Sequence, residues 1–208
     1  MRVSAIRPDP RVTGYLIVEV DGDRLASLPV EVVKEMGLAP GEELAPSRHE
    51  ALQEAALAEA ARQVALRMLG VRPHAVADIG RKLRDRGHDS RAIQAALSRL
   101  EAAGLLNDAE FARHFVRVRA PKGHGPSRLI HDLITRGVSR GVAEQAVGDV
   151  IRTEELDIDA AARAVAEKRV AALRSFPPAV RKRRLLAYLA RRGFQGAGVR
   201  DVVKRLLG

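Results

Sequence analysis

Histidine is the side chain here with the widest chemical range, because the chain contains no cysteine. The six imidazoles are those of His49, His74, His88, His114, His124 and His131. No two of them have the His-x-x-x-His spacing that directs two ring nitrogens from one helix face to a zinc ion. We therefore expect neither a metal site nor a bound cofactor.

Residues 122–127, with the sequence KGHGPS, come nearest to a phosphate-binding loop. They lack the G-x-x-x-x-G-K-[ST] arrangement and do not follow a predicted strand. We interpret them as a basic loop between helices that is able to touch a phosphate backbone. No nucleophile with a base and an orienting group can be identified either, so we predict that the protein is not an enzyme.

Positive charge is concentrated in the last two-thirds of the chain. Residues 1–60 carry 6 basic and 11 acidic side chains, whereas residues 61–208 carry 30 and 15. This asymmetry predicts an anionic partner, with nucleic acid or a nucleoprotein first. The alternative is that the arginine-rich composition reflects a GC-rich genome and that the charge only solvates the surface.

Two basic clusters supply the candidate contacts. On a helix over 178–192, Arg181, Arg184 and Arg191 share a narrow sector with Tyr188 beside it, a pattern able to stack on an exposed base. The alternative is that Tyr188 covers the edge of the core and the arginines are solvated. With no Trp, two Tyr and four Phe, the chain favours backbone electrostatics or protein contact over a dedicated stacking platform. The candidate DNA- or filament-binding residues are Arg113, Arg117, Arg119, Lys122, Arg128, Arg136, Arg181, Arg184, Tyr188 and Arg191.

A repeated phrase, Leu-x-x-Arg-Gly, organises these clusters. It ends at Gly87, Gly137 and Gly193, and aliphatic residues follow each copy in register. Each copy predicts a helix, a tight turn on a left-handed glycine and a second helix. Asp89 and Ser139 are good N-caps for the second helix, and the corresponding Gln195 is a poorer one. The repeated arginine either complements the C-terminus of the first helix or belongs to a basic stripe.

The sequence pattern of the first 45 residues is typical of β-structure and not of helical repeats. Extended runs at 15–20 and 23–28 flank an Asp-Gly pair, which predicts a β-hairpin. Pro29 is expected to open a short helix that Gly37 ends, and 38–44 to form a turn and a short strand. A capping box at 47–50 predicts the start of a long helix.

We therefore predict a mainly α protein with four parts. Tandem three-helix repeats would form an elongated curved array, preceded by a small β-hairpin module and a long linking helix. The expected boundaries are 1–46 for the β module, 47–106 for the long helix and first repeat, 107–155 for the second repeat and 156–208 for the third.

Two segments resemble the RecX family of bacterial regulators of the RecA recombinase. Residues 100–112, LEAAGLLNDAEFA, are similar to the family's L-x-x-x-G-L-[LI]-[ND]-D-x-x-F-A. Residues 125–138, GPSRLIHDLITRGV, are similar to its G-x-x-x-[LI]-x-x-[ED]-L-x-x-[KR]-G-[VI]. The resemblance covers about residues 60–208. Departures are Ala75, where a Ser or Thr cap is usual, and Gly80, which weakens the following helix.

The resemblance implies a protein that binds the RecA–single-stranded DNA filament. It implies inhibition of ATP hydrolysis, strand exchange and coprotease activity, and so modulation of homologous recombination, DNA repair and the SOS response. The expected partners are the RecA filament and single-stranded DNA, with double-stranded DNA as a further candidate. We expect a cytoplasmic monomer without membrane contact, since no apolar run is long enough to span a bilayer.

Two other classes of function remain open. One is a helical transcriptional regulator that binds DNA without RecA, although the helices after the three glycines are poor in base-reading side chains. The other is a scaffold whose basic surface meets an acidic protein. A further hypothesis is that the acidic N-terminal module docks on the basic repeats and moderates DNA binding, so that truncation near residue 46 raises affinity for bare DNA.

Overall fold

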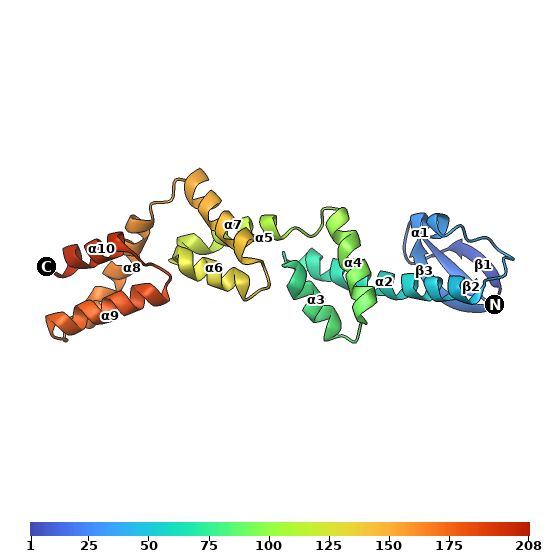
Figure 1. The fold of residues 1–208 in the computed structure, drawn as a ribbon, viewed down its shortest axis with the longest axis horizontal. Coiled ribbons are helices and arrows are strands. Elements are labelled where there is room, and N and C mark those ends of the chain that lie inside the picture. The colour runs from blue at the N-terminus through green and yellow to red at the C-terminus, as the bar shows by residue number, and fades with distance from the viewer. The chain divides into compact units, whose positions relative to one another are not determined.

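The computed structural model describes residues 1–208, which form two compact units (Figure 1). The first unit comprises residues 1–73 and 79–106, and the second comprises residues 74–78 and 107–208. Helices predominate in both units, and the strands are confined to the N-terminal part of the first.

The N-terminal module is a three-stranded antiparallel sheet in the order β1-β2-β3. The strands are β1 (Val3–Pro8), β2 (Tyr15–Val20) and β3 (Asp23–Pro29). The predicted hairpin is confirmed: Asp21 and Gly22 both have positive φ, at 52° and 90°, as a two-residue hairpin turn requires. The sequence did not predict β1. The strand predicted within 38–44 is wrong, since that segment makes only an isolated bridge between Glu43 and Arg2.

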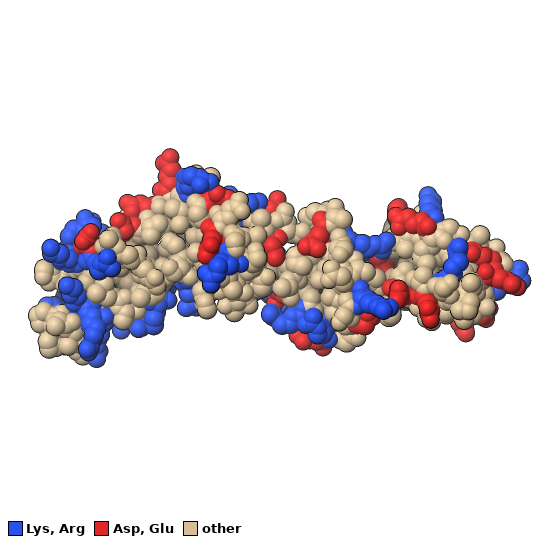
Figure 2. All heavy atoms as spheres, viewed as in Figure 1, with Lys and Arg blue, Asp and Glu red and all other residues tan.

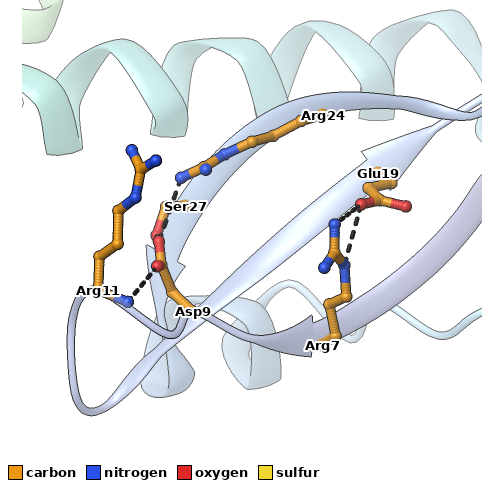
Figure 3. Close-up of polar contacts among 6 residues, drawn as sticks. All are labelled: Arg7, Asp9, Arg11, Glu19, Arg24 and Ser27. Atoms are coloured by element: carbon orange, nitrogen blue, oxygen red, sulfur yellow. Dashed lines mark hydrogen bonds and ion pairs between the residues drawn. The ribbon is translucent and has the colours of Figure 1, made fainter.

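A buried carboxylate fastens the loop after β1 to the sheet (Figure 3). The Asp9 side chain is only 2% exposed. It accepts hydrogen bonds from the Ser27 hydroxyl at 2.5 Å, the backbone N–H of Arg11 at 2.9 Å and the Arg24 guanidinium at 3.1 Å. The Ser27 and Arg11 hydrogen bonds, followed by the charge of Arg24, lower the pKa of Asp9 below its ordinary value of 3.8.

Two helices follow the sheet, α1 (Val30–Glu35) and the long α2 (Pro46–Val71). Pro29 precedes α1 and Gly37, at φ 60°, follows it, as predicted. The capping box predicted at 47–50 is wrong. Helix α2 begins one residue earlier at Pro46, whose ring presets helical φ and whose missing N–H needs no cap.

The sheet packs on α2 through an apolar core and a polar network. Leu52 of α2 is fully buried with Val18 and Leu28 of the sheet. Two helical turns further along α2, the buried Glu59 carboxylate accepts hydrogen bonds from the Tyr15 hydroxyl at 2.6 Å and from the Arg62 guanidinium at 2.8 Å. Burial and the neighbouring Glu59 raise the pKa of Tyr15 above its ordinary value.

Helix α2 and the eight helices that follow it form three consecutive groups of three. Helix α2 packs with α4 in the first group, and each later group has its own apolar core. The helices are α3 (Val76–Arg84) and α4 (Ser90–Ala102); α5 (Asp108–Arg119), α6 (Pro126–Ile134) and α7 (Arg140–Thr153); α8 (Ile158–Val170), α9 (Pro178–Arg191) and α10 (Ala197–Leu207). Short 3-10 turns, Ala120–Lys122 and Ala171–Leu173, extend α5 and α8.

Side-chain caps begin several of these helices. Asp89 accepts from the N–H groups of Arg91 and Ala92, and Ser139 accepts from that of Val142, as predicted. Helix α10 has no side-chain cap and begins after Gly196, consistent with the poorer Gln195 at the matching place. The first helices of the second and third groups begin in the same way, with caps from Asn107 and Asp157.

The structure bears on both departures seen in the sequence of α3. Asp108, the first residue of α5, accepts a hydrogen bond from the backbone N–H of Val76 at 2.9 Å, so α5 supplies the cap that Ala75 lacks. Gly80 is buried, and a Cβ there would meet a Leu97 methyl at 3.4 Å. That distance is an ordinary van der Waals contact, so the packing of α3 on α4 leaves room for a Cβ at this position.

The glycines of the repeated phrase share one backbone state. Gly87, Gly137 and Gly193 have φ of 85°, 90° and 89°, the left-handed conformation that ends a helix. Two of them also touch the preceding group: a Cβ on Gly137 would overlap Ala77, and one on Gly193 would overlap Arg128. Gly87, in the first group, has nothing within 4 Å.

Candidate nucleic-acid interface

The third helix group carries most of the excess charge. Residues 157–208 contain 13 lysines and arginines and 4 acidic residues. Figure 2 shows these basic side chains gathered over α8–α10, whereas acidic and basic side chains alternate on the N-terminal sheet. A surface of this kind attracts phosphates at long range.

The cations converge at the seam where the second group meets the third within the second unit. We define the seam hollow as a cavity of about 290 Å³ lined by His124, Arg128, Tyr188, Arg191 and Arg192. The first two residues come from the segment that opens α6, and the last three from the end of α9. Residues at least 60 positions apart in sequence thus share one small cavity.

Backbone contacts hold the two sides of the seam together. The N–H of Gly125 donates to the Arg192 carbonyl at 2.7 Å, and the N–H of Ser127 donates to the Gly193 carbonyl at 3.2 Å. The two N–H groups belong to the start of α6, and the two carbonyl groups belong to the end of α9. Backbone N–H groups at the start of a helix and carbonyl groups at its end lack partners within that helix, so the two helix ends satisfy one another. The close approach fixes Arg128 beside the end of α9.

Little negative charge compensates these cations. Arg128 is paired with Asp132 at 2.8 Å, whereas Arg191 and Arg192 are paired with no carboxylate. The Nδ1 of His124 lies 3.7 Å from the same Asp132 carboxylate, beyond hydrogen-bond distance.

Burial lowers the pKa of His124 below its ordinary 6.5. The charges of Arg119, Arg192 and Arg128 also lower it, while Asp132 acts in the opposite direction. The imidazole is therefore neutral at pH 7.

Tyr188 lies between the guanidinium groups of Arg169 and Arg192. The sequence suggested Arg181, Arg184 and Arg191 as its neighbours. Its ring is half-buried, with Arg169 and Arg192 at 5.4 Å and 5.6 Å from its centroid. Both distances are within the range of a cation–π contact. The side chain forms one wall of the seam hollow.

Arg181 and Arg184 lie away from the seam hollow. Arg184 stacks over Phe176, 3.8 Å from the ring centroid, and the Nε of Arg181 is buried without a partner. Arg181, Arg184 and Arg191 share one angular sector of α9, as predicted, but only Arg191 lines the seam hollow. Arg191 lies two helical turns beyond Arg184, at the end of α9 that meets the seam.

The second group contributes fewer free cations than the sequence suggested. Arg117 is paired with Glu154 at 2.5 Å, and Arg119 and Arg136 both lie over the Phe115 ring. Arg113 is half-buried and lines none of the cavities around the seam. Lys122 is exposed and lines a hollow next to the seam hollow.

Sequence reasoning did not select three cations that the structure brings to this region: Lys168, Arg169 and Arg192. Arg192 is the arginine of the repeated phrase. Its counterparts Arg86 and Arg136 donate to carbonyls one turn back in their own helices, at 3.0 Å and 2.5 Å. The hydrogen bonds of Arg86 and Arg136 agree with the first interpretation of the repeated arginine, whereas Arg192 lines the seam hollow.

Comparison with known proteins identifies the three helix groups. Residues 61–100, 107–147 and 157–203 match the first, second and third three-helix domains of RecX. The chain belongs to the RecX family. The predicted resemblance and the mainly helical fold of three-helix repeats behind a small β module are thereby confirmed.

Curated relatives carry the name regulatory protein RecX. One from Halorhodospira halophila is 40% identical over 147 residues, covering 70% of this chain and 87% of the relative. One from Pseudomonas entomophila is 34% identical over 148 residues, covering 71% and 90%. RecX proteins are regulators rather than enzymes, which agrees with the absence of a catalytic set in the sequence.

Two solved RecX structures share the fold. One crystal structure of regulatory protein RecX superposes with a TM-score of 0.80 at 21% identity and covers 98% of each chain. RecX from Lactobacillus salivarius superposes with a TM-score of 0.63 at 20% identity, covering 72% of this chain and 96% of that one. No helix of the present structure combines the length and apolarity needed to cross a membrane.

Proposed function

We propose that this RecX protein binds the RecA–single-stranded DNA filament and inhibits its ATP hydrolysis, strand exchange and coprotease activities. The observation that carries the proposal is the cation cluster of the seam hollow, in which Arg128 alone has a carboxylate partner, on a chain that belongs to a family of regulatory proteins. Such a cluster suits a nucleoprotein, which presents phosphates beside protein side chains.

The physical basis of inhibition is occupancy. Each phosphate neutralised by a guanidinium or ammonium group releases counterions from the DNA, so several contacts give strong, salt-dependent binding. A protein that holds the strand and the adjoining recombinase together obstructs the addition of further RecA subunits. No covalent step is involved. We assign Lys122, Arg128, Tyr188 and Arg191 to this contact, and Arg181 and Arg184 to the charged surface beside it.

A direct transcriptional regulator is less well supported. The helices that follow the three repeated glycines are α4, α7 and α10, and each spends its aliphatic face on its own core, as Ala143 and Val147 do in α7. Few side chains of the type that reads base edges remain on them. Sequence-specific protection of a duplex without RecA would favour that function instead.

The test is RecA ATP hydrolysis on single-stranded DNA, titrated with this protein from far below to equal RecA concentration. Inhibition at substoichiometric amounts is the expected result, because a protein at one growing end stops many additions. Inhibition only near saturation of the DNA would indicate competition for the strand. No inhibition, with DNA binding retained, would contradict the proposal.

A further inference from the structure

We propose that a single DNA strand crosses the seam between the second and third three-helix domains, with its phosphodiester groups seated in a row of three hollows. The inference rests on the proposed function only in taking nucleic acid as the ligand. It places the strand across α6 and α9, rather than along the face of α9 that carries Arg181 and Arg184.

The three hollows form a row because neighbouring hollows share lining residues. The seam hollow shares Arg128 and Arg191 with a second hollow of about 330 Å³, which also includes Ser127, His131 and Gln195. On its other side it shares Tyr188 and Arg192 with a third of about 290 Å³. The three cavities therefore adjoin one another along the seam, and we call this row the track.

Cations line the track from end to end. Lys122 and Lys168 stand in the third hollow, Arg192 joins it to the seam hollow, and Arg128 and Arg191 join the seam hollow to the second. No carboxylate lines any of the three hollows, and Asp132, which lies beside them, is paired with Arg128. Like charges held this close repel one another, and an anion in the track would relieve the repulsion.

The protein holds these charges in place by its backbone and not by their mutual attraction. The hydrogen bonds from Gly125 and Ser127 to the end of α9 persist whatever the ionisation of the side chains. The helix ends that carry these cations are therefore held together before a ligand binds, and a ligand bears only the cost of ordering the side chains. This is the arrangement expected of a binding site, and it is not needed to stabilise the domain junction.

Cavity size and continuity favour a polymer. Each hollow has a volume close to the lower limit of cavities that enclose a drug-sized molecule, roughly 300 Å³. A phosphate group fits such a space, and a chain of phosphates fits three in succession. Tyr188, in the wall of two hollows, offers an aromatic edge to a sugar or base without the broad platform of a stacking protein. An acidic peptide is the competing occupant.

The first test measures binding of the full chain to fluorescein-labelled oligo(dT) by anisotropy, without RecA, over a range of salt concentrations. We expect Arg191→Gln to weaken binding about tenfold at low salt and to reduce the slope of log K against log salt by about 0.7, one single-strand phosphate contact. The matched control is Arg183→Gln, which removes the same charge from an exposed position of α9 outside the track. It should change affinity less than about twofold and leave the slope unaltered.

A second measurement locates the strand. Oligo(dT) carrying 5-iodouracil is irradiated on the protein, and tryptic digestion should release a cross-linked peptide 185–191, which contains Tyr188. Equal effects of the two substitutions together with cross-links only outside 120–131 and 185–195 would overturn the proposal. So would loss of polyglutamate binding in Arg191→Gln with oligo(dT) binding unchanged. Thermal unfolding of both variants checks that each is folded.

These outcomes are separable from those of the proposed function. If Arg191→Gln loses oligo(dT) while the wild type does not slow RecA ATP hydrolysis, the strand path stands and filament regulation fails. If the wild type inhibits RecA while Arg191→Gln and Arg183→Gln bind DNA equally, filament regulation stands and the strand path fails.

Discussion

The backbone of Gly193 lies directly against the backbone of Arg128. A Cβ on Gly193 would overlap both the nitrogen and the Cβ of Arg128, and the carbonyl oxygen of Gly125 lies 2.8 Å from the same point. The glycine that ends α9 is thus also the surface on which the start of α6 rests. One residue type meets two demands, a left-handed turn and a close approach.

Gly193→Ala should therefore destabilise the protein more than the same change elsewhere in the repeat. We expect a loss of about 3 kcal/mol in the free energy of unfolding, from left-handed strain of about 1–2 kcal/mol and overpacking of similar size. Gly87→Ala is the matched control, because Gly87 has nearly the same φ and nothing within 4 Å. Urea unfolding of both variants gives the comparison, and equal losses would show that the contact with Arg128 contributes nothing.

Asp108→Ala should loosen the start of α3. The carboxylate accepts from the N–H of Val76 at 2.9 Å, and removing such a cap costs about 1 kcal/mol. Glu110→Ala, in the same first turn of α5, is the control and should cost less, since no hydrogen bond from α3 reaches it. Hydrogen exchange should show faster exchange of the Val76 amide in Asp108→Ala alone. Unchanged protection of that amide would contradict the assignment.

Glu59→Ala should release the N-terminal sheet from α2. The substitution leaves the Arg62 guanidinium, 20% exposed, and the Tyr15 hydroxyl without their shared acceptor, at a cost of about 3 kcal/mol. Glu54→Ala on the same helix removes an exposed pair with Arg91 and should cost under about 1 kcal/mol. Thermal unfolding monitored by circular dichroism measures both. A cost for Glu59→Ala no larger than that for Glu54→Ala would show the network to be unimportant.

His124 should make stability depend on pH in a definite direction. Its pKa is lowered on folding, first by burial, so the unfolded chain takes up the proton before the folded chain does. The stabilisation that it contributes is therefore present above its ordinary pKa of 6.5 and is lost as the pH falls below that value. His124→Gln removes this dependence, so the difference in stability between wild type and variant should shrink from pH 7.5 to pH 5.5. A difference in stability that stays constant with pH would contradict the assignment of this dependence to His124. The comparison with the variant is needed because the chain has five other histidines.

The same titration bears on DNA binding. Arg119, Arg128 and Arg192 oppose protonation of His124 and Asp132 favours it. A phosphate in the track offsets those three cations, so the pKa of His124 should rise on binding. Affinity for oligo(dT) should accordingly increase as the pH falls from 7.5 to 6, and His124→Gln should weaken this dependence. The opposite trend in the wild type would argue against an anion in the seam hollow.

Truncation near residue 46 is a poorer experiment than the sequence suggested. The sheet covers Leu52 of α2, and Tyr15 completes the hydrogen bonds of the buried Glu59. Removing residues 1–46 would expose Leu52 and would leave the buried Glu59 carboxylate without the Tyr15 hydroxyl. Any change in DNA affinity would therefore be confounded by unfolding of α2. Whether the acidic module moderates DNA binding remains a prediction, better tested by charge-neutral substitutions on its exposed face.

Local patterns were sufficient for most of the helical architecture. The Leu-x-x-Arg-Gly phrase predicted three helix–turn–helix units because a left-handed glycine and a following cap act within a few residues. The Asp-Gly hairpin was predictable for the same reason. Strand β1 was not, since it depends on pairing with β2 and its own residues alternate weakly. The division of the chain at 46, 106 and 155 remains a prediction.

The sequence by itself determined the family, the helical repeats and the location of the positive charge, because motif spacing, periodicity and charge are properties of the linear chain. Only the tertiary structure decided which cations meet. His124 and Arg128 face Arg191 and Arg192 because Gly125 and Gly193 allow two backbones to touch, and no local pattern reports a contact across more than 60 residues. Helical angle alone grouped Arg191 with Arg184, but the domain junction lies at one end of α9, and two turns of helix separate them.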